Sequence, residues 1–209
     1  MAGIKKLMIL CLFPCLFLGA CLNLKQPRNE VTFYTLEYDT PLKNKGQALP
    51  YSIGLERFSV APVYNSNQII YRDGSFRRAS YTYHKWRANP GDLITYFLAR
   101  DMKASGFFKA ALSQDSGIPV THTLEGSVEE FFELDTAETW SAVLTLSITL
   151  MVEDEPDISK RILYQKTYRA VKGCKQRNPQ ALAEAMSHAM AEVSEKIIRD
   201  ARSRLMDVP

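Results

Sequence analysis

The chain has 209 residues, of which 46% are hydrophobic and 23% are charged, a composition that supports one globular domain with its own core. Its 26 Lys and Arg side chains nearly balance 23 Asp and Glu, which gives a formal net charge of +3. This balance lacks the basic excess of a nucleic-acid-binding surface, so nucleic acid is not expected as a partner.

The first twenty residues have the layout of a bacterial secretory leader. A lysine pair is followed by the apolar run Leu7–Leu18, and the small residues Gly19 and Ala20 precede Cys21. The apolar stretch up to Ala20 is shorter than the roughly 20 residues that a membrane-spanning helix needs. We therefore predict that residues 1–20 are a signal peptide, cleaved between Ala20 and Cys21.

The sequence Leu18-Gly19-Ala20-Cys21 resembles a lipoprotein lipobox. The resemblance implies that Cys21 carries an S-diacylglycerol group and an N-linked acyl chain such as palmitate, with no other cofactor. Each buried methylene stabilises membrane attachment by about 0.8 kcal/mol, so three acyl chains would hold the protein firmly. By resemblance to lipoproteins of diderm bacteria, Leu22 in place of aspartate implies an anchor in the outer membrane, with the protein on its periplasmic face. An ordinary signal peptide with a chance cysteine and an uncleaved membrane anchor are the alternatives.

The mature chain is expected to be a short tether followed by one domain. Residues 21–30 show no sustained periodicity and are predicted to be the lipidated tether, whereas residues 31–209 are predicted to form the domain. Once the leader is removed and Cys21 is acylated, Cys174 is the only thiol left. No internal disulfide is therefore expected.

The first half of the domain is predicted to contain strands and then a helix. Asn89-Pro90 is a helix start, and Gly106 ends the helix after about Ser105. Asp101 falls on the apolar side of this helix, so it should be paired or lie at the rim of the core. β-Branched and aromatic residues predict strands at Val31–Tyr38, Tyr51–Val60, Gln68–Arg72 and Ser80–Trp86.

The second half is predicted to be a strand meander closed by a long helix. Asn178-Pro179 begins the helix, which runs to about Leu205. A two-residue period predicts strands at Thr121–Leu134, Trp140–Val152 and Ile162–Val171, the middle one with an apolar core face and a partly wet polar face. The predicted class is α/β, mixed and α+β-like, a single domain whose mixed, mostly antiparallel sheet has two main helices packed on it.

The motifs of the common enzyme classes are missing from the sequence. It contains no nucleophile elbow, phosphate loop, dinucleotide fingerprint or zinc-protease motif. Glu184, His188 and Glu192 have metal-ligand spacing, but they centre the polar face of the last helix and are expected to be solvated. We therefore expect no catalytic residue and no metal, and predict that the protein is not an enzyme.

One segment combines side chains that suit a protein interface. Aromatic, amide and guanidinium groups lie close to a proline-marked bend, and such groups are common at contact surfaces. Ordinary loop and strand packing explains the same pattern equally well. The candidate partner-binding residues are Tyr64, Asn67, Gln68, Tyr71 and Arg72.

Six short segments carry a family resemblance across nearly the whole mature chain. They are Tyr34-Thr35-Leu36, Ile53-Gly54 to Pro62, Asn67-Gln68-Ile69-Ile70-Tyr71-Arg72, Tyr83-His84-Lys85-Trp86, Ser105-Gly106-Phe107-Phe108-Lys109 and Leu124-Glu125-Gly126-Ser127-Val128-Glu129-Glu130-Phe131. Their order and spacing behind a lipobox resemble the ABC-type transport auxiliary lipoproteins.

The resemblance implies a non-enzymatic component of an intermembrane lipid transport system of the paraquat-inducible or MCE type. The implied partners are a periplasmic MCE-domain protein, which this chain would dock, and an ABC permease with its ATPase. Assembly into a homo-oligomer is left open. The alternatives are a structural or assembly lipoprotein of another outer-membrane complex, and an anchored periplasmic hydrolase whose activity would depend on His84 or His122.

Overall fold

The computed structural model describes residues 30–44, 46–73, 76–113 and 116–207. Val31–Pro209 forms one unit, distinct from Met1–Glu30. The predicted cleavage after Ala20 and the lipidation of Cys21 lie outside the described residues, so both stay predictions.

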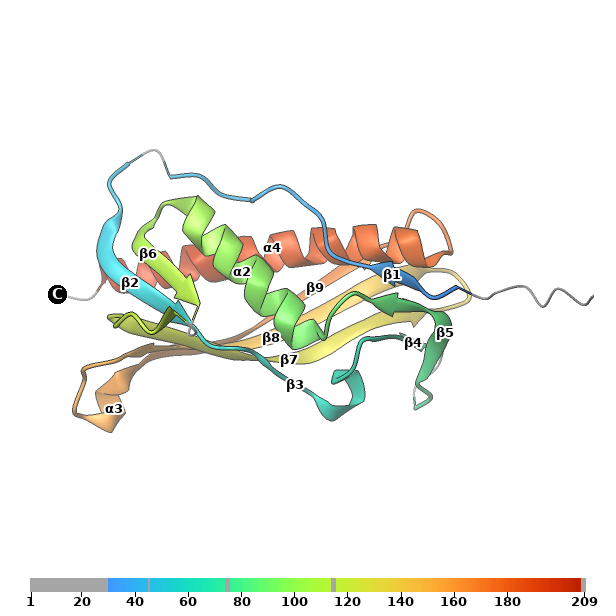
Figure 1. Cartoon of the computed structure of the whole chain (residues 1–209), viewed down its shortest axis with the longest axis horizontal. Coiled ribbons are helices and arrows are strands. Elements are labelled where there is room, and N and C mark those ends of the chain that lie inside the picture. Colours follow the sequence, from blue (N-terminus) through green and yellow to red (C-terminus); the bar gives the residue numbers. More distant parts are fainter. Residues whose placement is uncertain (1–29, 45, 74–75, 114–115, 208–209) are drawn as a thin grey trace, which may run out of the picture. The chain divides into compact units, whose positions relative to one another are not determined.

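In the described part of the chain, nine strands form one mixed sheet (Figure 1). The strands are β1 (Thr32–Tyr34), β2 (Leu49–Leu55), β3 (Ser59–Val60), β4 (Gln68–Arg72), β5 (Ala79–Trp86), β6 (Phe108–Ser113), β7 (His122–Asp135), β8 (Trp140–Val152) and β9 (Ile162–Gly173). The helices are α2 (Pro90–Ser105), the short α3 (Ile158–Arg161), α4 (Pro179–Met206) and the 3₁₀ turn η2 (Pro62–Tyr64).

Strand β7 is the centre of the sheet. It pairs antiparallel with β8, which pairs antiparallel with β9, and these long ladders are the predicted meander. Strands β2, β3 and β4 run parallel to β7, while β6 is parallel to β2 and β1 is parallel to β5. The predicted mixed fold class is confirmed, with the longest ladders antiparallel and the shorter ones mostly parallel.

Both predicted main helices are confirmed to within a residue or two at each end. Asn89 accepts a hydrogen bond from the Gly91 amide at the start of α2, and Gly106 ends this helix with φ of 66°. Asn178 accepts one from the Ala181 amide at the start of α4. Helix α4 packs along β8 and β9, while α2 packs on β6 and β7 and also touches α4 (Figure 1).

Two predicted strands are shorter than expected because tertiary contacts replace sheet pairing. The first strand ends at Tyr34; beyond it Leu36 is buried, and the Glu37 amide donates to Ser187 Oγ of α4. The second is interrupted between β2 and β3, where Phe58 turns fully into the core. Strand β6, α3 and η2 were not predicted.

The two faces of β8 are less different than the sequence suggested. Leu144, Leu146 and Ile148 on the core face are fully buried, as expected. The opposite face is polar, but Thr145 and Thr149 are only 7% exposed. Long side chains from the neighbouring strands cover them, because Thr145 donates to Glu130 and Thr149 accepts from Gln165.

Asp101 is buried and paired, which is one of the two outcomes expected from the sequence. Its carboxylate is 1% exposed and accepts hydrogen bonds from the Tyr38 hydroxyl, at 2.7 Å, and from the Arg100 guanidinium, at 2.8 Å. The Arg100 guanidinium also lies over the Tyr38 ring, 4.4 Å from its centroid. Two partners thus offset the cost of burying this charge.

Candidate partner-binding site

The candidate segment begins on η2, which the sheet holds firmly. The Ala61 amide donates to the Val128 carbonyl of β7, and Pro62 begins the 3₁₀ turn. Tyr64 ends the turn with only 6% of its surface exposed, and its ring stacks on Phe132 with 5.9 Å between the centroids. An aromatic anchor therefore fixes where the following residues leave the core.

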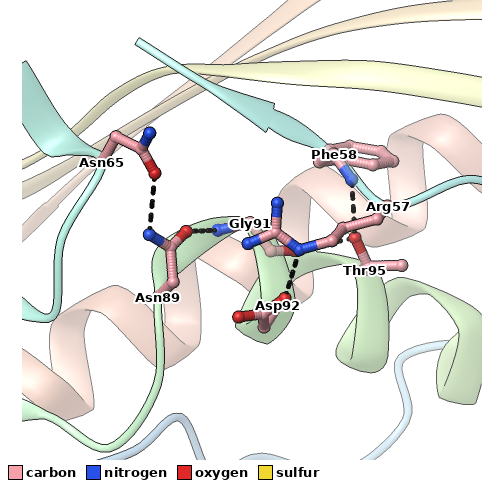
Figure 2. Close-up of polar contacts among 7 residues, drawn as sticks. All are labelled: Arg57, Phe58, Asn65, Asn89, Gly91, Asp92 and Thr95. Atoms are coloured by element: carbon pink, nitrogen blue, oxygen red, sulfur yellow. Dashed lines mark hydrogen bonds and ion pairs between the residues drawn. The ribbon is translucent and has the colours of Figure 1, made fainter. Parts of the chain in front are cut away.

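The loop after Tyr64 is tied to the first turn of α2. Figure 2 shows Asn89 Nδ2 donating to Asn65 Oδ1, at 2.9 Å, while Asn89 Oδ1 accepts from the Gly91 amide, also at 2.9 Å. One side chain thus caps the helix and holds the loop. The cap satisfies an otherwise free helical amide, which is the usual role of asparagine at this position.

Phe58 fills the space between this helix start and β7. Its amide donates to Thr95 Oγ1, which in turn donates to the Gly91 carbonyl (Figure 2). A Cβ atom at Gly91 would lie 2.5 Å from the Phe58 carbonyl oxygen, and one at Gly126 would lie 2.7 Å from Phe58 Cε2. Both glycines are therefore needed for close approach.

The outer side of the same helix turn carries an exposed ion pair. Arg57 Nε donates to Asp92 Oδ1, and both side chains are about half exposed. The hydrogen bond from this carboxylate raises the pKa of Arg57. Because solvent screens exposed pairs, the contact adds little stability, and it serves mainly to position the two side chains.

The structure places the five predicted residues in different environments. Asn67 and Gln68 are exposed, Tyr71 and Arg72 are half-buried, and Tyr64 lies in the core. The backbone beneath the two exposed amides is fixed, because the Asn67 carbonyl accepts from the Trp86 amide at 2.8 Å. Asn67 and Gln68 are thus the members of the set that a partner could contact directly.

Tyr71 belongs to a buried polar cluster instead. Its ring lies 5.2 Å from that of Tyr81, whose hydroxyl donates to Glu133 at 3.0 Å. Glu133 is 1% exposed, and burial raises its pKa to about 7; the nearby Asp135 charge adds to this effect and the Tyr81 hydrogen bond opposes it. Tyr71 therefore packs against Tyr81, the residue that holds the buried Glu133 carboxyl group.

Arg72 turns toward the other face of the sheet. Its guanidinium lies 5.5 Å from the centroid of the Phe132 ring, the ring on which Tyr64 stacks. Among the described residues, none accepts a hydrogen bond from its buried Nε. Tyr64 and Arg72 thus meet on Phe132, a contact that their sequence spacing did not indicate.

Sequence reasoning missed Asn65 and Phe58 as parts of this site. The Asn89-Pro90 signature predicted the helix cap, but nothing in it indicated a second bond to Asn65, 24 residues earlier. The interruption of the predicted strand Tyr51–Val60 at Phe58 has no local signal either. Both features depend on the packing of α2 against β3 and β7.

The histidines take part in local contacts. His84 Nδ1 lies 3.2 Å from the Tyr34 hydroxyl, and His122 Nδ1 lies 2.9 Å from Thr121 Oγ1. Burial lowers the pKa of His122.

Within the described ranges, no three His, Cys, Asp or Glu side chains converge in the manner of metal ligands. Of the helices that the structure describes, none is long and apolar enough to span a membrane.

Comparison with known proteins decides the family. The model of the ABC-type transport auxiliary lipoprotein component matches residues 34–198. The chain belongs to this family. The resemblance seen in the sequence is thereby confirmed, and the protein is a lipoprotein-type auxiliary component of ABC-type transport. No curated protein matches the sequence.

Solved structures with low sequence identity share the fold. A Xanthomonas campestris protein of the DUF330 family superposes with a TM-score of 0.73 at 16% identity, over 83% of this chain and 96% of its own. A further crystal structure gives 0.64 at 11% identity, over 82% and 99%. The hypothetical protein CT253 of Chlamydia trachomatis gives 0.50 at 8% identity, over 75% and 98%.

Proposed function

We propose that this auxiliary lipoprotein is a non-enzymatic, outer-membrane-anchored component of an MCE-type intermembrane phospholipid transport system, in which it docks the periplasmic MCE protein. The observation that carries the proposal is the family match over residues 34–198, directly behind a lipobox that ends at Cys21. An ABC permease and its ATPase complete the system and supply the energy.

The two proposed roles, anchoring and docking, belong to different parts of the chain. The acyl groups on Cys21 fix the protein to one membrane, and the folded domain presents a rigid surface to the bridging partner. Asn67 and Gln68 suit this role, because their backbone is bound to β5 while their side chains reach solvent. A preorganised loop loses less conformational freedom on binding than a mobile one.

A pocket beside β2 and β7 has an acidic lining that is poorly suited to a lipid acyl chain. It has a volume of about 350 Å³, and its lining includes Glu56, Glu153 and Asp154. Carboxylates in such a site would disfavour an acyl chain, because burying them against hydrocarbon is costly. In this proposal the partner proteins move the lipid.

Site-specific photo-crosslinking in intact cells tests the docking role. A photo-reactive amino acid replaces Gln68, and the matched control replaces Lys196, which is exposed on α4. We expect the MCE protein to be captured from position 68 and not from position 196. Capture of an outer-membrane assembly protein instead would support the alternative role in another complex, and equal capture of the MCE protein from both positions would contradict docking through this loop.

A further inference from the structure

Four segments gather at one end of the sheet, which we call the tether end. They are the start of β1 at Val31–Phe33, the β4–β5 connection at Phe76–Arg78, the β7–β8 turn at Thr136–Thr139 and the β9–α4 connection at Cys174–Asn178. Strand pairing brings the β4–β5 connection and the β7–β8 turn together, because Tyr71 of β4 lies opposite both Ala79 of β5 and Glu133 of β7. The Cys174 amide donates to the Trp140 carbonyl and places the β9–α4 connection beside the same turn. Strand β1 pairs with the last three residues of β5. Figure 1 shows β1, β4 and β5 at this end, with α3 at the opposite end.

Exposed aromatic and aliphatic side chains mark the tether end. Phe76 is 99% exposed, and Phe33, Tyr83 and Val31 are each more than 40% exposed. Phe33 and Tyr83 lie on the paired strands β1 and β5, and Phe76 lies just before β5. Aromatic side chains of this kind are favoured at the interface between a bilayer and water.

Strands β4 and β5, with the connection between them, carry an excess of positive charge. Between Gln68 and Ala88 the sequence has five basic residues and one acidic residue, Asp73. The Arg87 guanidinium lies 5.5 Å from the centroid of the Phe33 ring. The β7–β8 turn, the β9–α4 connection and the last residue of β7 together add no net charge, because they contain two acidic residues, Asp135 and Glu138, and two basic ones, Lys175 and Arg177. The basic residues are Arg72, Arg77, Arg78, Lys85 and Arg87.

The chain enters the domain from this end. Strand β1 is parallel to β5, with Thr32 opposite His84 and Tyr34 opposite Trp86. The chain therefore runs back from Thr32 through Val31 in the direction of the β4–β5 connection. Nine residues lie between Cys21 and Val31, so the chain spans ten residue-to-residue steps. Even a fully extended chain of that length reaches only about 35 Å. A lipid on Cys21 therefore keeps the tether end close to the bilayer that holds it.

We propose that the tether end rests on the membrane that holds the Cys21 acyl chains, with Phe33, Phe76 and Tyr83 among the lipid headgroups and the nearby arginines on the phosphates of anionic phospholipid. This inference rests on the lipid anchor of the proposed function. It orients the domain, because α3 then points away from the bilayer (Figure 1). Basic groups near an anionic surface are attracted to it, and aromatic groups penetrate the headgroup region.

Lipid quenching in reconstituted vesicles tests the contact. The full lipidated chain carries Cys174→Ser, so that a cysteine introduced at Phe76 is the only free thiol for an environment-sensitive fluorophore. The matched control carries the label at Ile158, which is 79% exposed on α3. The vesicles contain phosphatidylcholine and phosphatidylglycerol with brominated acyl chains. We expect quenching at position 76 to exceed that at position 158 severalfold.

Two further measurements distinguish the effect of the basic side chains from the effect of the lipid anchor. Arg77→Gln with Arg78→Gln should reduce the quenching at position 76 in vesicles with phosphatidylglycerol, and leave it unchanged in phosphatidylcholine alone. Equal quenching at positions 76 and 158 in protein that still pellets with the vesicles would overturn this inference and leave the anchor intact. Protein that stays in the supernatant would contradict the anchor, and the inference with it.

Discussion

The Tyr81 hydroxyl donates a hydrogen bond to the Glu133 carboxyl group at 3.0 Å and so joins β5 to β7 beneath the surface. Glu133 is 1% exposed. Its pKa rises to about 7 from an ordinary value of 4.5, chiefly because burial disfavours the charged form. The folded protein therefore binds a proton at this position over a pH range in which the unfolded chain has lost it.

The stability of the domain should fall as the pH rises through this range. Because the folded pKa lies above the unfolded one, the contribution of Glu133 is complete below pH 4.5 and is lost as the pH passes about 7. The loss would be roughly 3 kcal/mol. Chemical denaturation across this range measures the free energy of unfolding, and Glu133→Gln, which cannot ionise, should remove most of the slope. An identical slope in the variant and the unchanged protein would show that Glu133 is not the group responsible.

Gly91→Ala should destabilise the domain by about 2 kcal/mol or more, because the new methyl group would meet the Phe58 carbonyl at 2.5 Å and Val60 Cγ2 at 2.9 Å. Thermal or urea unfolding measures the change. Gly173→Ala is the matched control, since no atom lies within 4 Å of its added Cβ. If both variants lose the same stability, the close approach at Gly91 is not the cause.

Asn89→Ala should cost about 1 to 2 kcal/mol and also loosen the loop at Asn65. The reason is that Asn89 both caps α2 and donates to Asn65 Oδ1. Hydrogen exchange should rise in residues 64–68, in addition to the loss of stability. Asn178→Ala is the control, because it removes the cap of α4 without touching that loop. Asn89→Asp should keep the cap and still loosen the loop, because a carboxylate has no proton to donate to Asn65.

Cys21→Ala should leave the domain folded but abolish membrane fractionation and transport, because no acyl chain can be attached. Fractionation followed by limited proteolysis tests both parts. Recovery of the variant in the membrane fraction would contradict the lipid anchor. Mass spectrometry of the mature amino terminus provides a direct check on the unchanged protein.

Local patterns were sufficient for the elements that are long or bounded by strong signals. The strand Trp140–Val152 has the predicted bounds, and α2 begins after Asn89 and ends at Gly106 as predicted. In these cases alternation, capping and the left-handed glycine act within a few residues. Strand β6 was not predicted, because Phe108–Ser113 is short and its parallel pairing with β2 depends on residues far away in the sequence.

The candidate site was predictable only in part. Composition singled out the segment Tyr64–Arg72, but it did not separate the exposed amides of Asn67 and Gln68 from the buried ring of Tyr64. Burial of Tyr64 depends on Phe132, which is distant in the chain and comes next to it because β3 and β4, on either side of η2, both pair with β7. The same pairing places Tyr71 beside the Glu133 cluster.

The sequence by itself determined the family, the mixed α and β class, and the expectation of a lipid at Cys21, because each depends on patterns within short stretches of neighbouring residues. The tertiary structure alone decided which side chains reach solvent, why Gly91 must lack a side chain, and that exposed aromatic and basic groups share the end where the tether enters. Those features arise from contacts between strands and helices far apart in the chain, and such contacts leave no local pattern in the residues that make them.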